Sequence, residues 1–286
     1  MSETLIFGVL GHQIGYSQSP EIFKAISDIH GFEHSFVFHD IDPSDFAQEF
    51  PRVLTSGING FSVTIPHKKR VMPYLDELDT KASQIGAVNS ICVKQARAYG
   101  FSTDGDGFKI PLLNHTAHLK NTVALIFGAG GAAGAVVHCL ANVFRIAEFY
   151  VIGRDIDRVN KFCLELGEAL PEVKLHATLN SNWRKHRDVD YSLLVNCTPL
   201  GGWNYPDRSP VPEDFTWLKG RLYYDLSYND ANRVVEMAHS KGLIAFDGSF
   251  MLIGQAIRSY ELWTGRSVDF EPVYRAVFGH RQGQSG

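Results

Sequence analysis

The sequence contains few cysteines and no pattern that would pair them. Only four occur among 286 residues, and none of them forms a C-x-x-C pair: Cys92, Cys139, Cys163 and Cys197. Disulfide frameworks and structural zinc sites both need clustered cysteines, so neither is indicated. We expect reduced thiols, a cytoplasmic location and no metal ion.

Basic charge and long apolar runs are also scarce. Lys and Arg total 27 against 31 Asp and Glu, the net charge is -4, and no basic block could follow a phosphate backbone. The longest uncharged apolar run, residues 123–137, contains glycines and is shorter than the ~20 residues of a membrane helix. The first residues lack the cationic start of a signal peptide. We expect no nucleic-acid partner and no membrane partner.

The chain does have a regular alternation of short β-rich runs and helical patterns. Strands are predicted at residues 5–11, 34–41, 60–65, 87–94 and 98–102, with helices at 20–30, 43–56 and 105–114. A second series of strands is predicted at residues 122–128, 148–153, 173–177, 190–196, 221–227 and 242–248, before two C-terminal helices. The pattern predicts an α/β protein with mainly parallel sheets, divided near residues 105–120, with a ligand cleft between two domains.

A glycine-rich turn follows the strand predicted at 122–128. Gly128, Gly130 and Ala133 fit G-x-G-x-x-G/A between a strand and a helix. The first glycine permits the tight turn, the second lets backbone N–H groups approach a pyrophosphate, and the alanine permits close helix packing. The helix dipole favours the anion. The pattern predicts a dinucleotide site, and the alternative is a glycine-rich turn without a ligand.

The end of the next strand bears on the choice of cofactor. An NAD-preferring fold usually places an acid there to bind the ribose 2′-hydroxyl, but Gly153 and Arg154 occupy this position. A guanidinium can hold a 2′-phosphate, which favours NADP and leaves NAD possible. Asp155 orients Arg154, accepts a ribose hydroxyl, or simply begins the next helix.

Two serines near the N-terminus suggest an anion site. Ser17 and Ser19 are two apart in a segment predicted to be extended, so both hydroxyls should project to one side and could grip a carboxylate. Ser19 before Pro20 is also the pattern of a helix N-cap followed by proline. That structural interpretation leaves Ser17 unexplained.

The strand predicted at 60–65 leads to a lysine. Ser62 and Thr64 share one face of it, and the other face is apolar, with Phe61, Val63 and Ile65. Lys68 then lies just past the carboxyl end, where open α/β sheets collect their ligands. Alone, a lysine in this position would be interpreted as a solvated surface charge.

Eight motifs occur along the chain in a compatible order: YSQSP, SVTIPHK, GAVNS, GFSTDGDG, GAGGAA, NCTPLGG, DLSY and DGSFMLIGQ. Together they resemble the shikimate dehydrogenase family over nearly the entire chain. The resemblance implies a substrate-binding α/β domain at residues 1–105, a Rossmann-type doubly wound NADP-binding domain at 106–248, and C-terminal helices at 249–286 that return to the first domain. It implies reversible NADPH-dependent reduction of 3-dehydroshikimate to shikimate, in aromatic amino acid biosynthesis.

The resemblance also implies roles for matched positions. Lys68 and Asp104 would be the catalytic pair for proton transfer. The substrate would be bound by Ser17, Ser19, Thr64, Lys68, Asn89, Asp104, Tyr228 and Gln255. The cofactor would be bound by Gly128, Ala129, Gly130, Gly131, Ala132, Arg154, Leu226, Gly248 and Met251, with Asp155 beside Arg154.

The chemistry explains why such a pair is wanted. Hydride arriving at a ketone leaves negative charge on oxygen, which must be stabilised and then protonated. The Lys68 ammonium can donate to the nascent alkoxide, and its neutral form can take the alcohol proton in the reverse direction. Asp104 either shares this proton transfer or orients a ring hydroxyl and Lys68.

Departures from the family pattern leave alternatives open. They fall at the pocket rim, at Tyr16, Phe23, Lys24, Ser62 and Ser102, and also around the cofactor arginine, at Gly153 and Asp155, and at Gly202. A quinate or quinate/shikimate dehydrogenase using NAD or NADP is the nearest alternative. A non-catalytic sensor of metabolite or cofactor is another, which loss of Lys68 or Asp104 would mark, and both are present. The chain could act as a monomer or a homodimer.

Overall fold

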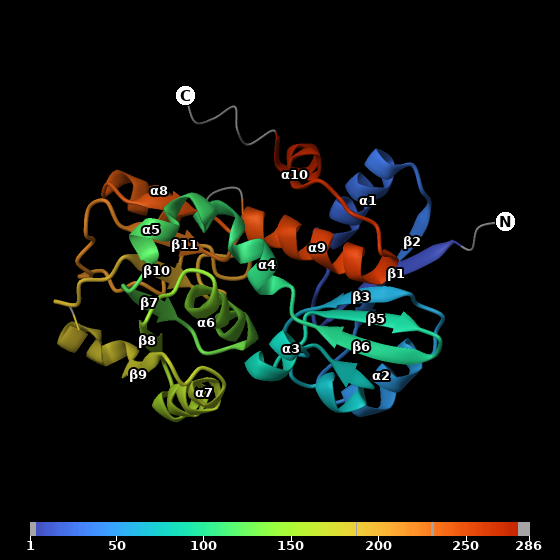
Figure 1. Ribbon diagram of the computed structural model, residues 1–286, viewed down its shortest axis with the longest axis horizontal. Coiled ribbons are helices and arrows are strands. Elements are labelled where there is room, and N and C mark those ends of the chain that lie inside the picture. The colour runs from blue at the N-terminus through green and yellow to red at the C-terminus, as the bar shows by residue number, and fades with distance from the viewer. Residues whose placement is uncertain (1–3, 187, 230–231, 280–286) are drawn as a thin grey trace. The chain divides into compact units, whose positions relative to one another are not determined.

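The computed structural model describes residues 4–186, 188–229 and 232–279, and the chain forms two compact units (Figure 1). Unit 1 comprises residues 1–107 and 253–286, and unit 2 comprises residues 108–252. Each unit is built on a sheet of six strands with helices packed on it. The predicted α/β class is confirmed.

The sheet of unit 1 is mixed. Its strands follow the order β2-β1-β3-β5-β6-β4, with bounds β1 (Leu5–Gly11), β2 (His34–Asp40), β3 (Gly60–Val63), β4 (Glu77–Leu78), β5 (Ser90–Lys94) and β6 (Arg97–Phe101). Strand β1 pairs in parallel with β2 and β3, whereas β5 runs antiparallel to β3 and β6. The carboxyl ends of β1, β2 and β3 therefore share one edge.

Aromatic packing joins the N-terminal and C-terminal helices of unit 1 to its sheet. Helices α1 (Ser19–His30) and α10 (Phe270–Phe278) lie side by side (Figure 1). The rings of Phe23 and Trp263 stack with centroids 5.2 Å apart. A Cβ at Gly60 would lie 2.3 Å from the Trp263 indole, so this strand position must be glycine. The unit also holds α2 (Phe46–Leu54), the 3-10 turn η1 (Met72–Tyr74), α3 (Thr80–Ile85), the start of α4 (Asp104–Phe108) and most of α9 (Ser249–Thr264).

The sheet of unit 2 is parallel throughout. Its order, β12-β11-β10-β7-β8-β9, is that of a doubly wound dinucleotide-binding fold. The strands are β7 (Val123–Phe127), β8 (Glu148–Gly153), β9 (Lys174–Leu179), β10 (Leu193–Asn196), β11 (Leu222–Asp225) and β12 (Ile244–Phe246). The helices are η2 (Ile110–His115), α5 (Thr116–Leu119), α6 (Gly131–Asn142), α7 (Ile156–Ala169), η3 (Asn180–His186) and α8 (Arg233–Ser240).

Two details differ from the sequence predictions, both beside proline. Strand β3 ends at Val63, and Ile65 is 63% exposed instead of buried, because the chain turns at residues 64–67 around Pro66. The helix predicted at 105–114 breaks after Phe108 into a 3-10 segment that contains Pro111, which has no N–H to continue the helix.

Within the described ranges, no helix is both long and apolar enough to cross a bilayer.

Candidate functional site

The two predicted serine hydroxyls lie together in unit 1. Ser17 Oγ donates to Ser19 Oγ at 3.1 Å, and the Ser17 N–H donates to the Ile14 carbonyl at 2.9 Å. The N-cap interpretation of Ser19 is wrong by one position. Ser19 is the first residue of α1 and the N-cap is Gln18, whose side chain makes no capping bond in the described chain. Neither serine is therefore the N-cap, and the paired hydroxyls can serve a carboxylate.

The carboxyl end of β3 presents two further hydroxyls. The Thr64 N–H donates to the Leu10 carbonyl at 2.8 Å, which fixes this end against β1. The Ser62 side chain is buried, and its hydroxyl has no hydrogen-bond partner among the described residues. A buried hydroxyl without a partner is costly, so Ser62 Oγ is a group that a ligand or water would satisfy.

Lys68 and Asp104 are brought together in unit 1. Lys68 Nζ donates to Asp104 Oδ2, and the two side chains are only 17% and 7% exposed. The Lys68 carbonyl accepts from the Val88 N–H at 2.9 Å, and Asp104 begins α4. A charge-assisted bond with little exposure to water holds the ammonium in one place.

His67 anchors the turn that carries Lys68, a role that the sequence reasoning missed. Its ring is fully buried and stacks on Phe46 with centroids 4.5 Å apart. Since a carbonyl can only accept, His67 Nε2 is the donor to the Ile41 carbonyl at 2.7 Å. Burial lowers the pKa of His67, so the imidazole is neutral at neutral pH.

Thr103 is the centre of a buried polar cluster next to Asp104. Its N–H donates to Asn89 Oδ1 at 2.6 Å, and its hydroxyl accepts from Asn89 Nδ2 at 2.8 Å. The same hydroxyl donates to the Gln255 carbonyl at 3.1 Å and lies 3.1 Å from Ser259 Oγ. Asn89 Nδ2 also donates to Gln255 Oε1 at 3.3 Å. The structure thus groups the predicted residues Asn89, Asp104 and Gln255 around a threonine that had no predicted role.

The glycine turn of unit 2 has the form expected for a dinucleotide. Gly128 has a φ of +110°, and a Cβ there would lie 3.2 Å from the Cys197 backbone, so other residues are disfavoured. A Cβ at Gly130 would meet nothing within 4 Å, and no side chain caps the start of α6 in the described chain. Residues 128–132 are half-buried, whereas Ala133 packs in the core. The backbone N–H groups at this helix start fit a pyrophosphate.

Arg154 and Asp155 have different surroundings at the end of β8. Asp155 is the N-cap of α7, and its Oδ1 accepts from the N–H groups of Asp157 and Arg158, each at 3.1 Å. Arg154 is exposed, and among the described residues it has no ion-pair partner. Asp155 therefore has a structural task, and the exposed cation beside it suits a phosphate.

Three predicted nicotinamide residues lie together in unit 2. A Cβ at Gly248 would lie 2.1 Å from the Leu226 carbonyl oxygen, so only glycine allows this approach. The Gly248 N–H donates to the Ser227 carbonyl at 2.8 Å. Leu226 packs against the core cluster that contains Met251. Tyr228, two residues after Leu226, is half-buried on the same turn.

A buried carboxylate fixes this turn, and the sequence reasoning gave it no role. Asp225 accepts from Tyr223 Oη at 2.6 Å, from the Ser227 N–H at 2.9 Å and from Ser227 Oγ at 2.5 Å. Asn196 Nδ2 lies 3.0 and 3.1 Å from the two carboxylate oxygens. Burial raises the pKa of Asp225. The carboxylate joins the ends of β10 and β11, and no cation pairs with it in the part of the chain that the structure describes.

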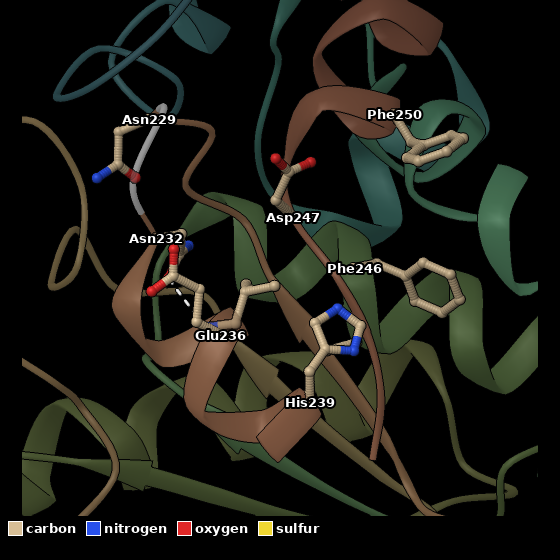
Figure 2. A pocket seen from close by; sticks show the side chains of 9 residues that line it. Asn229, Asn232, Glu236, His239, Phe246, Asp247 and Phe250 are labelled. Carbon is tan, nitrogen blue, oxygen red and sulfur yellow. Dashed lines mark hydrogen bonds between the residues drawn. The ribbon is translucent and has the colours of Figure 1, made fainter. Parts of the chain in front are cut away.

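Unit 2 also has an open hollow with a volume of about 280 Å³. Figure 2 shows Glu236 and His239 of α8 and the N-cap residue Asn232 on one side, with Phe246 and Asp247 opposite. None of the predicted site residues is among the described residues that line it. Among the residues that the structure describes, no group of three or more His, Cys, Asp or Glu side chains is placed to hold a metal ion.

Two segments of the chain, one near each end, match models of known protein families. Residues 9–91 match the shikimate dehydrogenase substrate binding domain, and residues 251–278 match the shikimate 5′-dehydrogenase C-terminal domain. A shikimate dehydrogenase (NADP(+)) from Symbiobacterium thermophilum is 33% identical over 98% of this chain and 95% of its own. One from Methanopyrus kandleri is 33% identical over 98% and 97%.

Solved structures show the same similarity in three dimensions. A shikimate 5-dehydrogenase from Thermus thermophilus, in complex with NADP(H) and shikimate, has a TM-score of 0.81 and 30% identity, covering 96% of this chain and 98% of its own. A 5-ketofructose reductase from a Gluconobacter strain has a TM-score of 0.80 at 22% identity, covering 98% and 100%. The latter similarity extends to the fold alone.

Proposed function

Because the chain belongs to the shikimate dehydrogenase family, we propose that it catalyses the reversible NADPH-dependent reduction of 3-dehydroshikimate to shikimate. The observation that carries this proposal is the shielded bond between Lys68 and Asp104, beside the polar cluster of Asn89, Thr103 and Gln255. An ammonium held at such a cluster can meet both a ring hydroxyl and a carbonyl oxygen.

We propose that Lys68 is the proton donor in the reduction. The ammonium would stabilise the charge that develops on the carbonyl oxygen and then transfer a proton to it. Asp104 would keep the amine in position and would accept a hydrogen bond from the neighbouring hydroxyl of the substrate ring. In the oxidation direction, the neutral amine would take the alcohol proton.

The remaining contacts of the substrate are proposed from the positions that match the family motifs. Ser17 and Ser19 would bind the carboxylate, and Tyr228 would complete that end. Thr64 would bind a ring hydroxyl together with Asn89 and Gln255. We propose that residues 1–105 and the helices at 249–286 serve the substrate, and residues 106–248 the cofactor.

The cofactor assignment is NADP. The bound nicotinamide would supply or take the hydride. The turn at residues 128–132 would hold the pyrophosphate on its N–H groups, and Arg154 would pair with the 2′-phosphate. Gly153 and Arg154 stand where an NAD-preferring fold places its acid, and the neighbouring Asp155 already caps α7. Leu226, Gly248 and Met251 would lie against the nicotinamide.

Two coarser features accompany this activity. The substrate is a small molecule, and the four cysteines are free, which fits a reducing compartment and a cytoplasmic location. Neither a nucleic acid nor a membrane is proposed as a partner.

Initial rates with shikimate and with quinate, each with NADP and with NAD, test the proposal. The highest kcat/KM is expected for shikimate with NADP. A clear preference for quinate with NAD would show that the chain is a quinate dehydrogenase instead. No turnover with any pair of substrate and cofactor would favour a non-catalytic sensor. The Arg154→Gln variant tests the cofactor preference directly. It should raise the KM for NADP about tenfold and leave the KM for NAD unchanged.

A further inference from the structure

The side chain of Asn196, the last residue of β10, is fully buried and uses both of its polar atoms. Its Oδ1 accepts from the Thr198 N–H at 2.9 Å and from Thr198 Oγ1 at 2.7 Å. Its Nδ2 donates to the Leu200 carbonyl at 2.8 Å and lies 3.0 and 3.1 Å from the two carboxylate oxygens of Asp225. One amide group therefore joins the loop after β10 to the turn after β11.

The loop after β10 packs on the glycine turn of unit 2. Asn196 is the register partner of Phe127 in β7, and the Cys197 N–H donates to the Phe127 carbonyl at 2.8 Å. A Cβ at Gly128 would lie 3.2 Å from the Cys197 carbonyl group and 3.3 Å from Thr198 Cγ2. The loop that Asn196 holds thus lies against the residue at which the proposed pyrophosphate turn begins.

The turn after β11 is held by the same residue from the other side. The Leu226 N–H donates to the Asn196 carbonyl at 3.0 Å. Asp225, which accepts from Asn196 Nδ2, also accepts from the Ser227 N–H at 2.9 Å and from Ser227 Oγ at 2.5 Å. The Gly248 N–H then donates to the Ser227 carbonyl at 2.8 Å. Hydrogen bonds therefore connect the carboxyl ends of β7, β10 and β11 with the turn after β12, and Asn196 lies at the middle of this series.

We propose that Asn196 is a positioning residue for hydride transfer, because it sets the spacing between the turn proposed for the pyrophosphate and the turn proposed for the nicotinamide. The inference rests on the proposed function. Residues 128–132 would keep their own N–H groups for the pyrophosphate in a variant of Asn196, whereas Leu226 and Gly248 would lose the contact that anchors their turn. A misplacement of about 1 Å can cost about 10²-fold in rate. Hydride transfer should therefore respond more strongly than cofactor affinity.

The partners of Asn196 explain why this position needs an amide. Thr198 presents two donors, whereas the Leu200 carbonyl and the Asp225 carboxylate are acceptors. A side chain here must accept at one atom and donate at the other, as an amide does. An aspartate would set a second carboxylate directly against Asp225, and an apolar side chain would leave these buried partners unsatisfied.

Kinetics and cofactor binding of Asn196→Ala test the proposal. For shikimate oxidation with NADP, kcat should fall about 10- to 100-fold, while the Kd of NADPH, measured by its fluorescence, should change less than about threefold. Leu193→Val, fully buried at the other end of β10, is the matched control. It should lower the urea midpoint of unfolding and leave kcat of the folded protein unchanged.

Ser227→Ala keeps the test decisive if Asn196→Ala does not fold. It removes one hydroxyl from the same series, so kcat should fall about three- to tenfold with an unchanged Kd of NADPH. Wild type assayed alongside separates the two levels of the proposal. An inactive wild type would overturn the proposed activity and the role of Asn196 together. An active wild type, with an unchanged kcat in the folded variants or with a loss of NADPH affinity alone, would overturn only the role of Asn196.

Discussion

The two units each bury a polar cluster at the ends of strands, but the clusters differ in character. The cluster of unit 1 is neutral, because Thr103 joins Asn89, Gln255 and Ser259 through hydroxyl and amide groups. The cluster of unit 2 is centred on the carboxyl group of Asp225, which accepts from several donors and has no cationic partner among the described residues. Hydroxyls and amides can exchange partners with a ligand, whereas a carboxylate with all its donors in place holds one geometry. Unit 1 is thus suited to bind hydroxyl groups, and unit 2 to keep a turn rigid.

The largest expected effect comes from the charged pair beside the neutral cluster. Lys68→Ala should lower kcat about 10³-fold, since a positioned proton donor contributes about 10² to 10⁴-fold. Binding of shikimate, measured by calorimetry, should change little, because the amine acts mainly on the transition state. Lys69→Ala, at the next position of the turn, where the side chain is exposed, is the control. Near wild-type turnover of Lys68→Ala would remove Lys68 from the mechanism.

The cluster around Asp225 in unit 2 should matter first for stability. Asp225→Ala should lower the free energy of unfolding by about 3 kcal/mol, because it leaves buried donors of Tyr223, Ser227 and Asn196 without their acceptor. Urea denaturation measures this change. Asp207→Ala removes an exposed carboxylate paired with Arg233 in the same unit and should change stability by about 0.5 kcal/mol or less. Equal effects of the two variants would contradict a structural role for Asp225.

The sequence patterns predicted local structure, whereas distant site residues were named only through the family resemblance, and the contacts that join them were not predicted. The parallel sheet of unit 2 and its glycine turn follow from strand, turn and helix signals within some 15 residues of one another. The Thr103 cluster joins residues far apart, since Asn89 and Gln255 are separated by 166 positions. The two-residue strand β4 carries too short a pattern to be recognised.

Two residues within the quoted motifs, Ile65 and Asp225, show the same limit of reasoning from local sequence. Ile65 looked buried because alternation was extended past Val63, but the turn around Pro66 turns its side chain outward. Asp225 lies in the motif DLSY, yet only its burial beside Tyr223 and Asn196 indicates what it does. The roles assigned to the site residues stay predictions until variants are measured.

Thr103 tests whether the neutral cluster serves catalysis or only packing. Thr103→Val keeps the shape but removes the hydroxyl that joins Asn89 to Gln255, so kcat/KM for shikimate should fall about 10- to 100-fold. Thr103→Ser keeps the hydroxyl and should restore most of the activity. If the valine and serine variants lose activity equally, packing of the methyl group explains the position and the hydroxyl does not.

The smallest expected effect concerns acid and His67, which anchors the turn that carries Lys68. The pKa of His67 lies below its usual value because of burial, so its stabilising contribution is present above pH 6.5 and is lost as the pH falls toward the folded-state pKa. The Ile41 hydrogen bond and Asp42 oppose that shift, whereas Arg70 and His12 add to it. His67→Gln keeps an N–H donor for Ile41 but cannot titrate. Between about pH 7.5 and 5.0, the free energy of unfolding should therefore fall more in wild type than in His67→Gln, and parallel pH curves would show that His67 does not titrate in this range.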